Sequence, residues 1–381
     1  MPNGVLAKMR SLNTSLTRTV GRIVAVSLSV AILAASCGSD DSEPSSGSGE
    51  SALDAVYSEL EGLDLDERRA RLLELAEAED ENLQLYTIVN LDDTAVYAQG
   101  FTEETGIDVE VFRARGGELL QRVLEENAAD QLGFDVLMVS SPEMIIIDAE
   151  EILHRLDTPY TDEIVPSTVN PNWSGVYLNV FLAAWNTDLL SEEARPTSWE
   201  QVLTGYPDAV ALEAGDFDWF ATLVQEYFVD RLGYTEEEAI ELFRVAVDHG
   251  RVIDGHTTLA ELLGAGEFDV VTSAYQHGID RFANNGSPIA WEPAVEPLVL
   301  RETGIGIRHD TPAPATALLF VDFMLSSQGQ DLLASVFRTP ANVTVAGGVD
   351  QELDILTIDV EQLNLEREKW EGLYEEIIRG N

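Results

Sequence analysis

The sequence predicts an α/β protein in which a mainly parallel sheet is flanked by helices. From residue 83 onward, short apolar runs alternate with amphipathic stretches, and this order builds parallel strands joined by crossover helices. The chain has 381 residues, of which 45% are hydrophobic, so it can bury a core large enough for two lobes. Gly106 ends one predicted helix of this series and Gly116 opens the next.

Residues 1–36 are predicted to be a cleavable signal peptide. Four basic residues precede an uncharged stretch over residues 23–36, which reads IVAVSLSVAILAAS. This stretch is shorter than the roughly 20 residues that a spanning helix needs, and it ends in small residues instead of a basic flank. We therefore expect it to be removed.

Cys37 follows this stretch and is the only cysteine of the chain. Residues 33–38, LAASCG, resemble the bacterial lipobox, in which the cysteine thiol is acylated before cleavage. A single unpaired thiol is unusual in an exported protein, and acylation accounts for it. We therefore expect a lipid on Cys37 that anchors the protein to the extracytoplasmic face of the cell membrane. An ordinary signal peptide with a chance cysteine is the alternative. Residues 37–50, rich in serine and glycine, are expected to form a flexible tether.

Residues 51–81 are expected to form a helical preface to the sheet. Two helical periodicities flank the segment Asp64-Leu65-Asp66, in which Asp66 is the expected cap of the second helix. Beyond the preface, strands are predicted over residues 83–87, 107–112 and 134–139, and helices over residues 92–105 and from residue 116.

The carboxyl ends of these strands are the place where we expect a ligand. In open sheets of this type, ligands bind beyond the carboxyl ends of the strands. The loops at that edge span residues 87–90, 115–118 and 140–142.

The formal net charge of −47, from 69 acidic and 22 basic residues, excludes nucleic acid as a partner. It predicts a carboxylate-rich surface that favours solubility and self-repulsion, and we expect a monomer. Paired carboxylates are too abundant here to indicate a hydrolase, and the sequence has no Gly-x-Ser-x-Gly elbow, no phosphate-binding loop with lysine and no His-Glu-x-x-His helix. We predict a binding protein and no enzyme, with a secreted hydrolase as the least favoured alternative.

Several moderate motifs, each in the expected order and spacing, connect the chain to one known family. The motifs that carry this likeness are residues 85–87, 101–109, 113–120, 184–187, 196–200, 255–263 and 317–330. Together they resemble the bacterial extracellular solute-binding proteins that feed ABC importers, in the branch that includes ferric-iron binders. The resemblance covers roughly residues 82–343.

The resemblance implies a two-lobed clamshell of the periplasmic-binding-protein type II, each lobe being a mostly parallel sheet flanked by helices. It implies a first lobe built from residues 82–183 and 288–345 and a second lobe built from residues 184–287. Residues 346–381 are expected to be a helical segment that packs on the lobes. Such a protein closes on a small solute in the cleft and delivers it to a membrane permease, without a cofactor.

Two predicted helix starts suit an anion. Gly116-Gly117, followed by Glu118, opens one helix, and residues 255–257 precede another, so free backbone N–H groups at both starts can bind a carboxylate or phosphate. A plain turn into a capped helix is the alternative reading.

Tyr275 is the candidate metal ligand. The resemblance places it where iron binders of the family carry two adjacent tyrosines, but its neighbours here are Gln276 and His277. Asn90 stands where such binders often have histidine, and Ser140 where a carboxylate ligand could be. Because ferric iron prefers phenolate and carboxylate oxygens, a ferric complex or another anion-containing solute is favoured over the bare ion.

An acidic segment offers a different ligand chemistry. Glu213, Asp216, Asp218 and Trp219 lie in a segment that resembles a loop of the second lobe facing the cleft, and carboxylates beside an aromatic face suit a polyamine or a thiamine-like cation. The alternative is that Trp219 packs in the core. The five histidines lack the close spacing of a zinc site. The full set of predicted ligand-binding residues is Thr87, Val89, Asn90, Gly116, Gly117, Glu118, Ser140, Ser141, Glu213, Asp216, Trp219, Thr257 and Tyr275.

Overall fold

The computed structural model describes residues 51–348 and 352–379, so the predicted signal peptide, Cys37 and the tether lie outside the described residues. The described residues form a mixed α/β structure around one sheet, which confirms the fold class. No helix in this part of the chain combines the length and the apolar character needed to cross a membrane. The strands are β1 (Leu83–Thr87), β2 (Val109–Arg113), β3 (Val136–Ser140), β4 (Trp173–Asn186), β5 (Val210–Glu213), β6 (Arg251–Ile253), β7 (Val270–Tyr275), β8 (Ile289–Ala290), β9 (Leu298–Ile307), β10 (Thr339–Pro340) and β11 (Ile355–Thr357).

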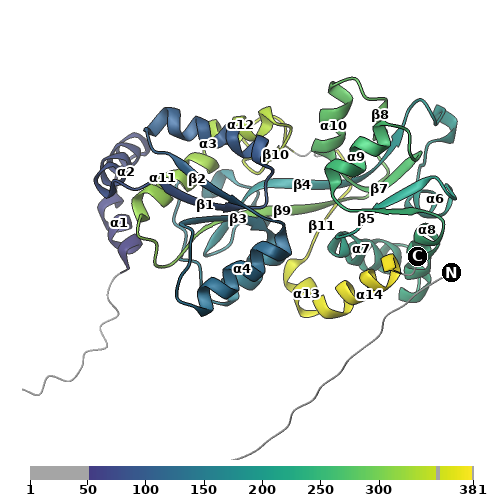
Figure 1. The fold of residues 1–381 in the computed structure, drawn as a ribbon, viewed down its shortest axis with the longest axis horizontal. Helices are drawn as coiled ribbons and strands as arrows, with labels where there is room; N and C mark the ends of the chain where they lie inside the picture. Colours follow the sequence, from purple (N-terminus) through teal and green to yellow (C-terminus); the bar gives the residue numbers. More distant parts are fainter. Residues whose placement is uncertain (1–50, 349–351, 380–381) are drawn as a thin grey trace, which may run out of the picture. The chain divides into compact units, whose positions relative to one another are not determined.

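The sheet has two halves that share the strands β4 and β9. Its main path runs β2-β1-β3-β9-β4-β7-β5-β6. In the first half, β1 pairs in parallel with β2 and β3, and in the second half β5 pairs in parallel with β6 and β7. β9 and β4 pair antiparallel with each other and with their outer neighbours β3 and β7. Figure 1 shows β4 and β9 running from one half into the other.

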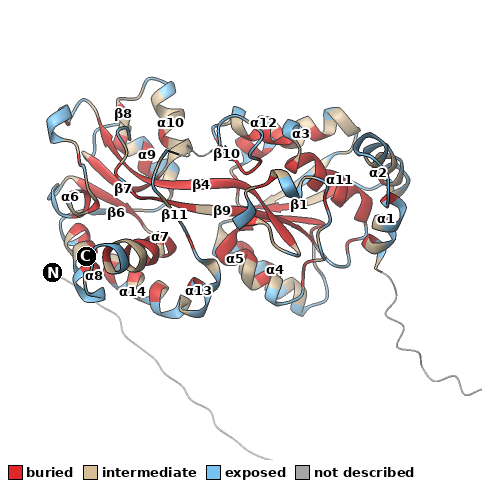
Figure 2. Cartoon of the chain, turned by 180° about the vertical axis from the view of Figure 1, so that it is seen from behind, coloured by how far each residue is buried: buried red, intermediate tan, exposed pale blue. Residues whose placement is uncertain are grey.

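Strand β4 shows why the sequence forms a buried layer here. All 14 of its residues are buried, and its sequence WSGVYLNVFLAAWN is almost continuously apolar, as expected for a strand covered on both faces. The parallel strand β3, with the sequence VLMVS, is buried throughout as well. Figure 2 shows the strands as a buried layer between helices whose outer faces are exposed. The sheet therefore provides a rigid base for the loops at its strand ends.

Helices flank the sheet in both halves (Figure 1). One segment, Leu223–Arg231, is a π-helix that continues α7. The α-helices are α1 (Ala52–Leu60), α2 (Leu65–Glu79), α3 (Leu91–Thr105), α4 (Gly116–Ala128), α5 (Ser141–Ala149), α6 (Trp199–Thr204), α7 (Phe217–Thr222), α8 (Glu236–Asp248), α9 (His256–Gly264), α10 (Gln276–Asn284), α11 (Pro314–Leu325), α12 (Ser327–Ser335), α13 (Val360–Leu365) and α14 (Arg367–Arg379).

Helix α2 is capped by Asp64, and the prediction of Asp66 as the cap was wrong. Asp64 has an extended backbone and its carboxylate accepts the N–H of Glu67, whereas Asp66 already lies inside the helix. At the other end of α2, the Glu79 carboxylate accepts the N–H groups of Ala315 and Thr316 in the first turn of α11. The preface helix thus supplies the cap that the apolar start of α11 lacks.

The C-terminal helix α14 packs on the second half of the sheet. Trp370 and Tyr374 are fully buried, and their rings lie 5.8 and 5.4 Å from the ring of Phe220 in α7, measured between centroids. Ile377, one turn further, is also buried. This spacing at residues i, i+4 and i+7 is that of an amphipathic helix whose apolar stripe completes a core.

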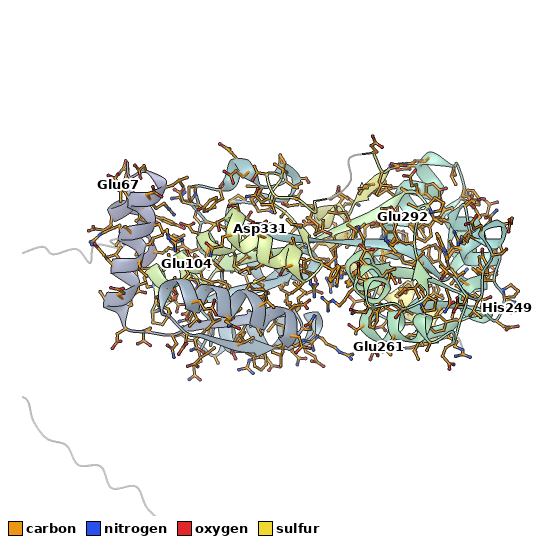
Figure 3. The ribbon with its side chains drawn as sticks, turned by 90° about the horizontal axis from the view of Figure 1, so that it is seen from above. Glu67, Glu104, His249, Glu261, Glu292 and Asp331 are labelled. Carbon is orange, nitrogen blue, oxygen red and sulfur yellow. The ribbon has the colours of Figure 1, made fainter. Side chains whose placement is uncertain are left out.

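The outer surface carries the acidic charge. Figure 3 shows the exposed side chains of Glu67, Glu261, Glu292 and Asp331 projecting from separate parts of the described chain. These labelled carboxylates lie in both halves of the described chain. This distribution fits the solvated acidic surface that the composition predicts.

Candidate functional site

A cavity of about 480 Å³ lies at the carboxyl ends of strands from both halves of the sheet. Its wall includes residues that end or follow β1, β2 and β3 in the first half and β5, β6 and β7 in the second. This is the edge at which the sequence predicts a ligand. The cavity brings together the predicted residues Val89, Asn90, Gly116, Gly117, Ser140, Glu213, Asp216, Thr257 and Tyr275.

Trp219 does not line the cavity. Its side chain is fully buried in the core of the second half, where its ring centroid lies 5.6 Å from that of Trp199 and 5.5 Å from that of Phe243. Helix α7 begins directly after Asp216, so Asp216 stays at the cavity while the first helical turn places Trp219 in the core. The interpretation of Trp219 as an aromatic face for a cation is therefore not supported by its position.

Three further predicted residues are also outside the wall of the cavity. Thr87 and Ser141 are fully buried, and the Thr87 hydroxyl accepts the N–H of Val89, so Thr87 supports the cavity loop from behind. Glu118 is exposed on α4. Asn90 lines the cavity, but its side chain already accepts the N–H of Asp93 as the cap of α3.

Four helices of nine or more residues begin at the cavity without a side-chain cap. The N-cap residues of α4, α5, α9 and α10 all line the cavity, and none of their side chains accepts a hydrogen bond from the first turn: they are Arg115, Ser140, Gly255 and Tyr275. Gly255 has φ of +97°, a conformation that favours glycine and leads the chain directly into α9. Free N–H groups at helix starts, together with the helix dipoles, favour a negatively charged ligand.

Five arginines line the cavity, against four carboxylates. In the whole chain the acidic residues outnumber the basic ones by 69 to 22, so this small volume is strongly enriched in positive charge. The arginines come from β2 and its loop, from α10, from β9 and from the turn before β10: they are Arg113, Arg115, Arg281, Arg301 and Arg338.

Arg301 occupies the inner end of this arginine set. Its guanidinium group donates to Asp218 at 2.6 Å and to the hydroxyl of Tyr275, whereas its Nε has no hydrogen-bond partner among the described residues. Burial acts against the charge, but the neighbouring Asp218 and Tyr275 hold the pKa of Arg301 well above its usual value. Arg301 therefore stays charged and retains one unused donor.

Asp93 joins the two halves beside the cavity. Its carboxylate accepts hydrogen bonds from Arg338 in the first half, at 2.8 Å, and from Arg281 in helix α10 of the second half, at 2.9 Å. Burial works against ionisation of Asp93, but the two arginines lower its pKa below the usual value. A second ion pair between the halves joins Arg115 to Asp254 at 2.9 Å, and both side chains are largely exposed.

Arg113 differs from the other four arginines. It is exposed at the end of β2, and its side chain makes no hydrogen bond or ion pair within the described ranges 51–348 and 352–379. Glu143 is the carboxylate on this side of the cavity, where it lies 3.9 Å from Arg367 and beside Gly116, and burial raises its pKa. Arg113 is thus the arginine with a full set of donors for a solute.

Three acceptor groups gather on the opposite side of the cavity. Glu213, Asp216 and His256 each offer one atom, and these atoms lie within 4.8 Å of one another, so the group can hold a cation. Burial, and then the charge of Glu213, raises the pKa of Asp216 well above its usual value. Burial and the charges of nearby arginines lower the pKa of His256 from 6.5 to about 3, so its ring is neutral. We call these three residues the acceptor cluster.

Most of the arginines and His256 are not predicted as site residues from the sequence. Arg281, Arg301 and Arg338 are far apart in the sequence and belong to no motif, although their rarity in so acidic a chain is a signal that would have drawn attention to them. His256 lies inside the segment predicted as a helix start, but its role depends on Glu213 and Asp216, which are about 40 positions away.

The chain is similar in sequence and fold to known binding proteins. The Fe(3+)-binding periplasmic protein of Serratia marcescens is 20% identical over 309 residues, which are 76% of this chain and 88% of that protein. Iron-bound HitA from Pseudomonas aeruginosa superposes with a TM-score of 0.66 at 19% identity, over 78% of this chain and 99% of that one. AfuA from Actinobacillus pleuropneumoniae, with fructose-6-phosphate bound, gives 0.67 at 20% identity, over 78% and 98%.

These likenesses show that the chain has the periplasmic-binding-protein fold that the sequence predicted. The profile of the bacterial extracellular solute-binding proteins matches residues 97–351, which include every strand of the sheet except β1 and β11 and the whole wall of the cavity except Ile88, Val89 and Asn90. That family consists of binding proteins. The chain therefore belongs to the bacterial extracellular solute-binding proteins, and its function is to bind a solute.

Proposed function

We propose that this protein captures a small solute bearing a carboxylate or phosphate group in the cavity and delivers it to an ABC permease. The observation that carries the proposal is the set of five arginines in a chain of net charge −47. A lipid on Cys37 would keep the receptor beside its permease on the extracytoplasmic face of the membrane. The protein works as a monomer and catalyses no chemical step.

The arginines and the helix starts act together in this proposal. Guanidinium groups donate two parallel hydrogen bonds to carboxylates and phosphates, which gives both affinity and orientation. The four uncapped helix starts add backbone donors around the same volume. Arg113 and Nε of Arg301 supply donors with no partner in the described structure.

A ferric complex of an anionic chelator is the second candidate. It is favoured by the iron-binding relatives and by Tyr275, whose phenol lines the cavity. The surroundings of Tyr275 disfavour the bare ion, because its hydroxyl accepts a hydrogen bond from the charged Arg301 and burial raises its pKa well above the usual value. A phenolate ligand would have to form against this shift.

A thermal-shift panel followed by calorimetry tests the proposal. The panel contains carboxylates, organic phosphates, neutral sugars, polyamines and ferric citrate, since a ligand that binds only the folded form raises the melting temperature. We expect an acid to bind, and Arg113→Gln to weaken it about tenfold, the effect of losing a charged hydrogen bond worth roughly 1.5 kcal/mol.

Arg251→Gln is the matched control. Arg251 is exposed at the start of β6, pairs with Glu267 and lies outside the cavity wall, so its replacement removes the same charge without touching the site. Binding of a neutral sugar or a polyamine with unchanged affinity in Arg113→Gln would refute the anionic assignment. Stoichiometric iron in protein purified without added iron, lost on replacement of Tyr275 by Phe, would favour the second candidate.

A further inference from the structure

We propose that the acceptor cluster of Glu213, Asp216 and His256 is a subsite for a primary ammonium group, so that the solute is zwitterionic: an amino carboxylate or an amino phosphate. The inference rests on the proposed function, because it assigns the other end of the same solute. The cavity then has two subsites of opposite charge: arginine donors bind the acid group, and the acceptor cluster binds the amine.

The first argument is the match of donors and acceptors. An ammonium group has three N–H donors and no acceptor, and the acceptor cluster presents three acceptor atoms within 4.8 Å of one another. His256 belongs in this count because its ring is neutral, so that one ring nitrogen can accept. The cluster lines the same cavity as the arginines.

Without a ligand, the cluster leaves buried polar atoms unpaired, which is unfavourable for the free energy of folding. Asp216 is 2% exposed, it lines the cavity, and its Oδ2 has no hydrogen-bond partner among the described residues. Nδ1 of His256 also lacks a partner, and its other nitrogen lies 3.4 Å from Asp216. A buried carboxylate that no cation neutralises is unfavourable, and an ammonium group in the cluster removes that cost.

The guanidinium group of the neighbouring Arg301 is already paired with another carboxylate. Arg301 favours the charged forms of Glu213 and Asp216 through space, but its guanidinium group is paired with Asp218 and hydrogen-bonded to Tyr275 and makes no ion pair with the cluster. Glu213 is held in place because its two carboxylate oxygens accept the N–H groups of Gly215 and Gly255. Glu213 is thus oriented before the solute enters.

An aromatic ring completes the subsite. The ring of Tyr275 lies 3.5 Å from the ring of His256, measured between centroids, and the two rings meet edge to face. An ammonium group within about 6 Å of such a ring is attracted by its π electrons. This ring takes the role that the sequence analysis gave to Trp219, which the core of the second half encloses.

Matched solute pairs test the inference by isothermal titration with the full chain. Each pair differs only in the amine: 4-aminobutanoate and butanoate, 6-aminohexanoate and hexanoate, and 2-aminoethyl phosphate and ethyl phosphate. We expect the amino member of at least one pair to bind ten or more times more tightly than its partner. Asp216→Asn keeps the shape of the side chain and should abolish that ratio.

Two measurements guard against indirect effects. Asp216→Asn removes a buried charge that has no full partner, so its ligand-free melting temperature should rise, which shows that the variant is folded. Asp322→Asn removes a buried carboxylate that pairs with Arg68 outside the cavity, and it should leave the tenfold ratio unchanged.

The outcomes separate this inference from the proposed function. If acids bind, depend on Arg113 and show no preference for the amine, the ammonium subsite is wrong and the anion receptor stands. If no acid binds, with or without an amine, both are wrong. A tenfold preference that survives Asp216→Asn overturns the assignment to this cluster. If Zn²⁺ or Mn²⁺ binds in a way that depends on Asp216 and no amino acid binds, the ammonium assignment is wrong and the cluster is a metal site.

Discussion

His256 gives the cavity a pH dependence that can be predicted with its sign. In the folded chain burial, and then Arg301 and Arg338, lower its pKa to about 3, whereas the unfolded chain takes up a proton near pH 6.5. Between these values the unfolded state binds more protons, so acidification through pH 6.5 destabilises the folded state until about pH 3. At neutral pH the folded state keeps almost all of the free energy of unfolding that is lost on acidification.

Replacement of His256 by glutamine isolates that contribution. Between pH 7 and pH 5 the wild type should lose about 2 kcal/mol more of its free energy of unfolding than His256→Gln does, measured by urea denaturation. The other titrating groups are common to both proteins and cancel. His249→Gln, at an exposed histidine after α8 (Figure 3), is the control and should follow the wild type. Parallel curves for His256→Gln and the wild type would refute the neutral state of the His256 ring.

At the scale of single residues, the candidate site was predicted only where local pattern determines it. Gly116, Gly117 and Thr257 belong to helix starts that are visible as glycine or threonine before an amphipathic stretch. Arg301 and Arg338 are different, because each is held largely out of solvent by a partner more than 80 residues away, Asp218 and Asp93 respectively. No periodicity in the sequence reports such a pairing.

At the scale of elements, the local pattern was more informative. The strand predicted over residues 83–87 has these bounds as β1, and the helix predicted over residues 92–105 begins one residue earlier as α3. The helix has a regular period, and its two ends are marked by Asn90 and Gly106. What the pattern cannot give is the order of strands in the sheet, where β9 lies between β3 and β4, because that depends on contacts distant in sequence.

Helices α3 and α10 are joined by the ion pair of Asp93 and Arg281, and this contact should restrain the two halves. Arg281→Gln removes the link between the halves and leaves the bond of Arg338 to Asp93 within the first half. We expect the ligand-free protein to sample a broader range of distances between α3 and α10. The side chain of Arg281 is 30% exposed, so the effect on stability should be small, at most about 1 kcal/mol.

Spin labels measure this change directly. Glu103 in α3 and Asn285 after α10 are exposed, so Glu103→Cys and Asn285→Cys can carry labels once Cys37 is replaced by serine. Pulsed dipolar spectroscopy should give a narrow distance distribution for the labelled wild type and a broader one with Arg281→Gln. Arg244→Gln, which breaks a surface pair within α8, should leave the distribution unchanged. Equal widths would show that the ion pair does not hold the halves together.

At the scale of the whole molecule, attachment to the membrane depends on Cys37, which lies outside the described residues. If the thiol carries the lipid anchor, Cys37→Ser should move the protein from the membrane fraction to the soluble one, because the described residues contain no helix suited to cross a bilayer. Fractionation followed by immunoblotting is the measurement. Ser36→Ala, beside the cysteine, is the control. Retention of Cys37→Ser on membranes would refute the lipid anchor.

The shared strands β4 and β9 determine how a filled cavity can be sensed from outside. These strands have 14 and 10 residues and run through both halves, and the pairing of β4 shifts register twice, between Gly175 and Tyr177 and between Leu182 and Ala184. Such irregularities bend a strand and increase its local twist. Any rotation of one half against the other must therefore be absorbed by the same two strands, and a solute held by Arg113 and Asp216 would pull on both halves at once. Binding of the solute would then be reported by one quantity, the angle between the two halves. A permease that contacts only the outer surfaces of both halves can recognise that angle.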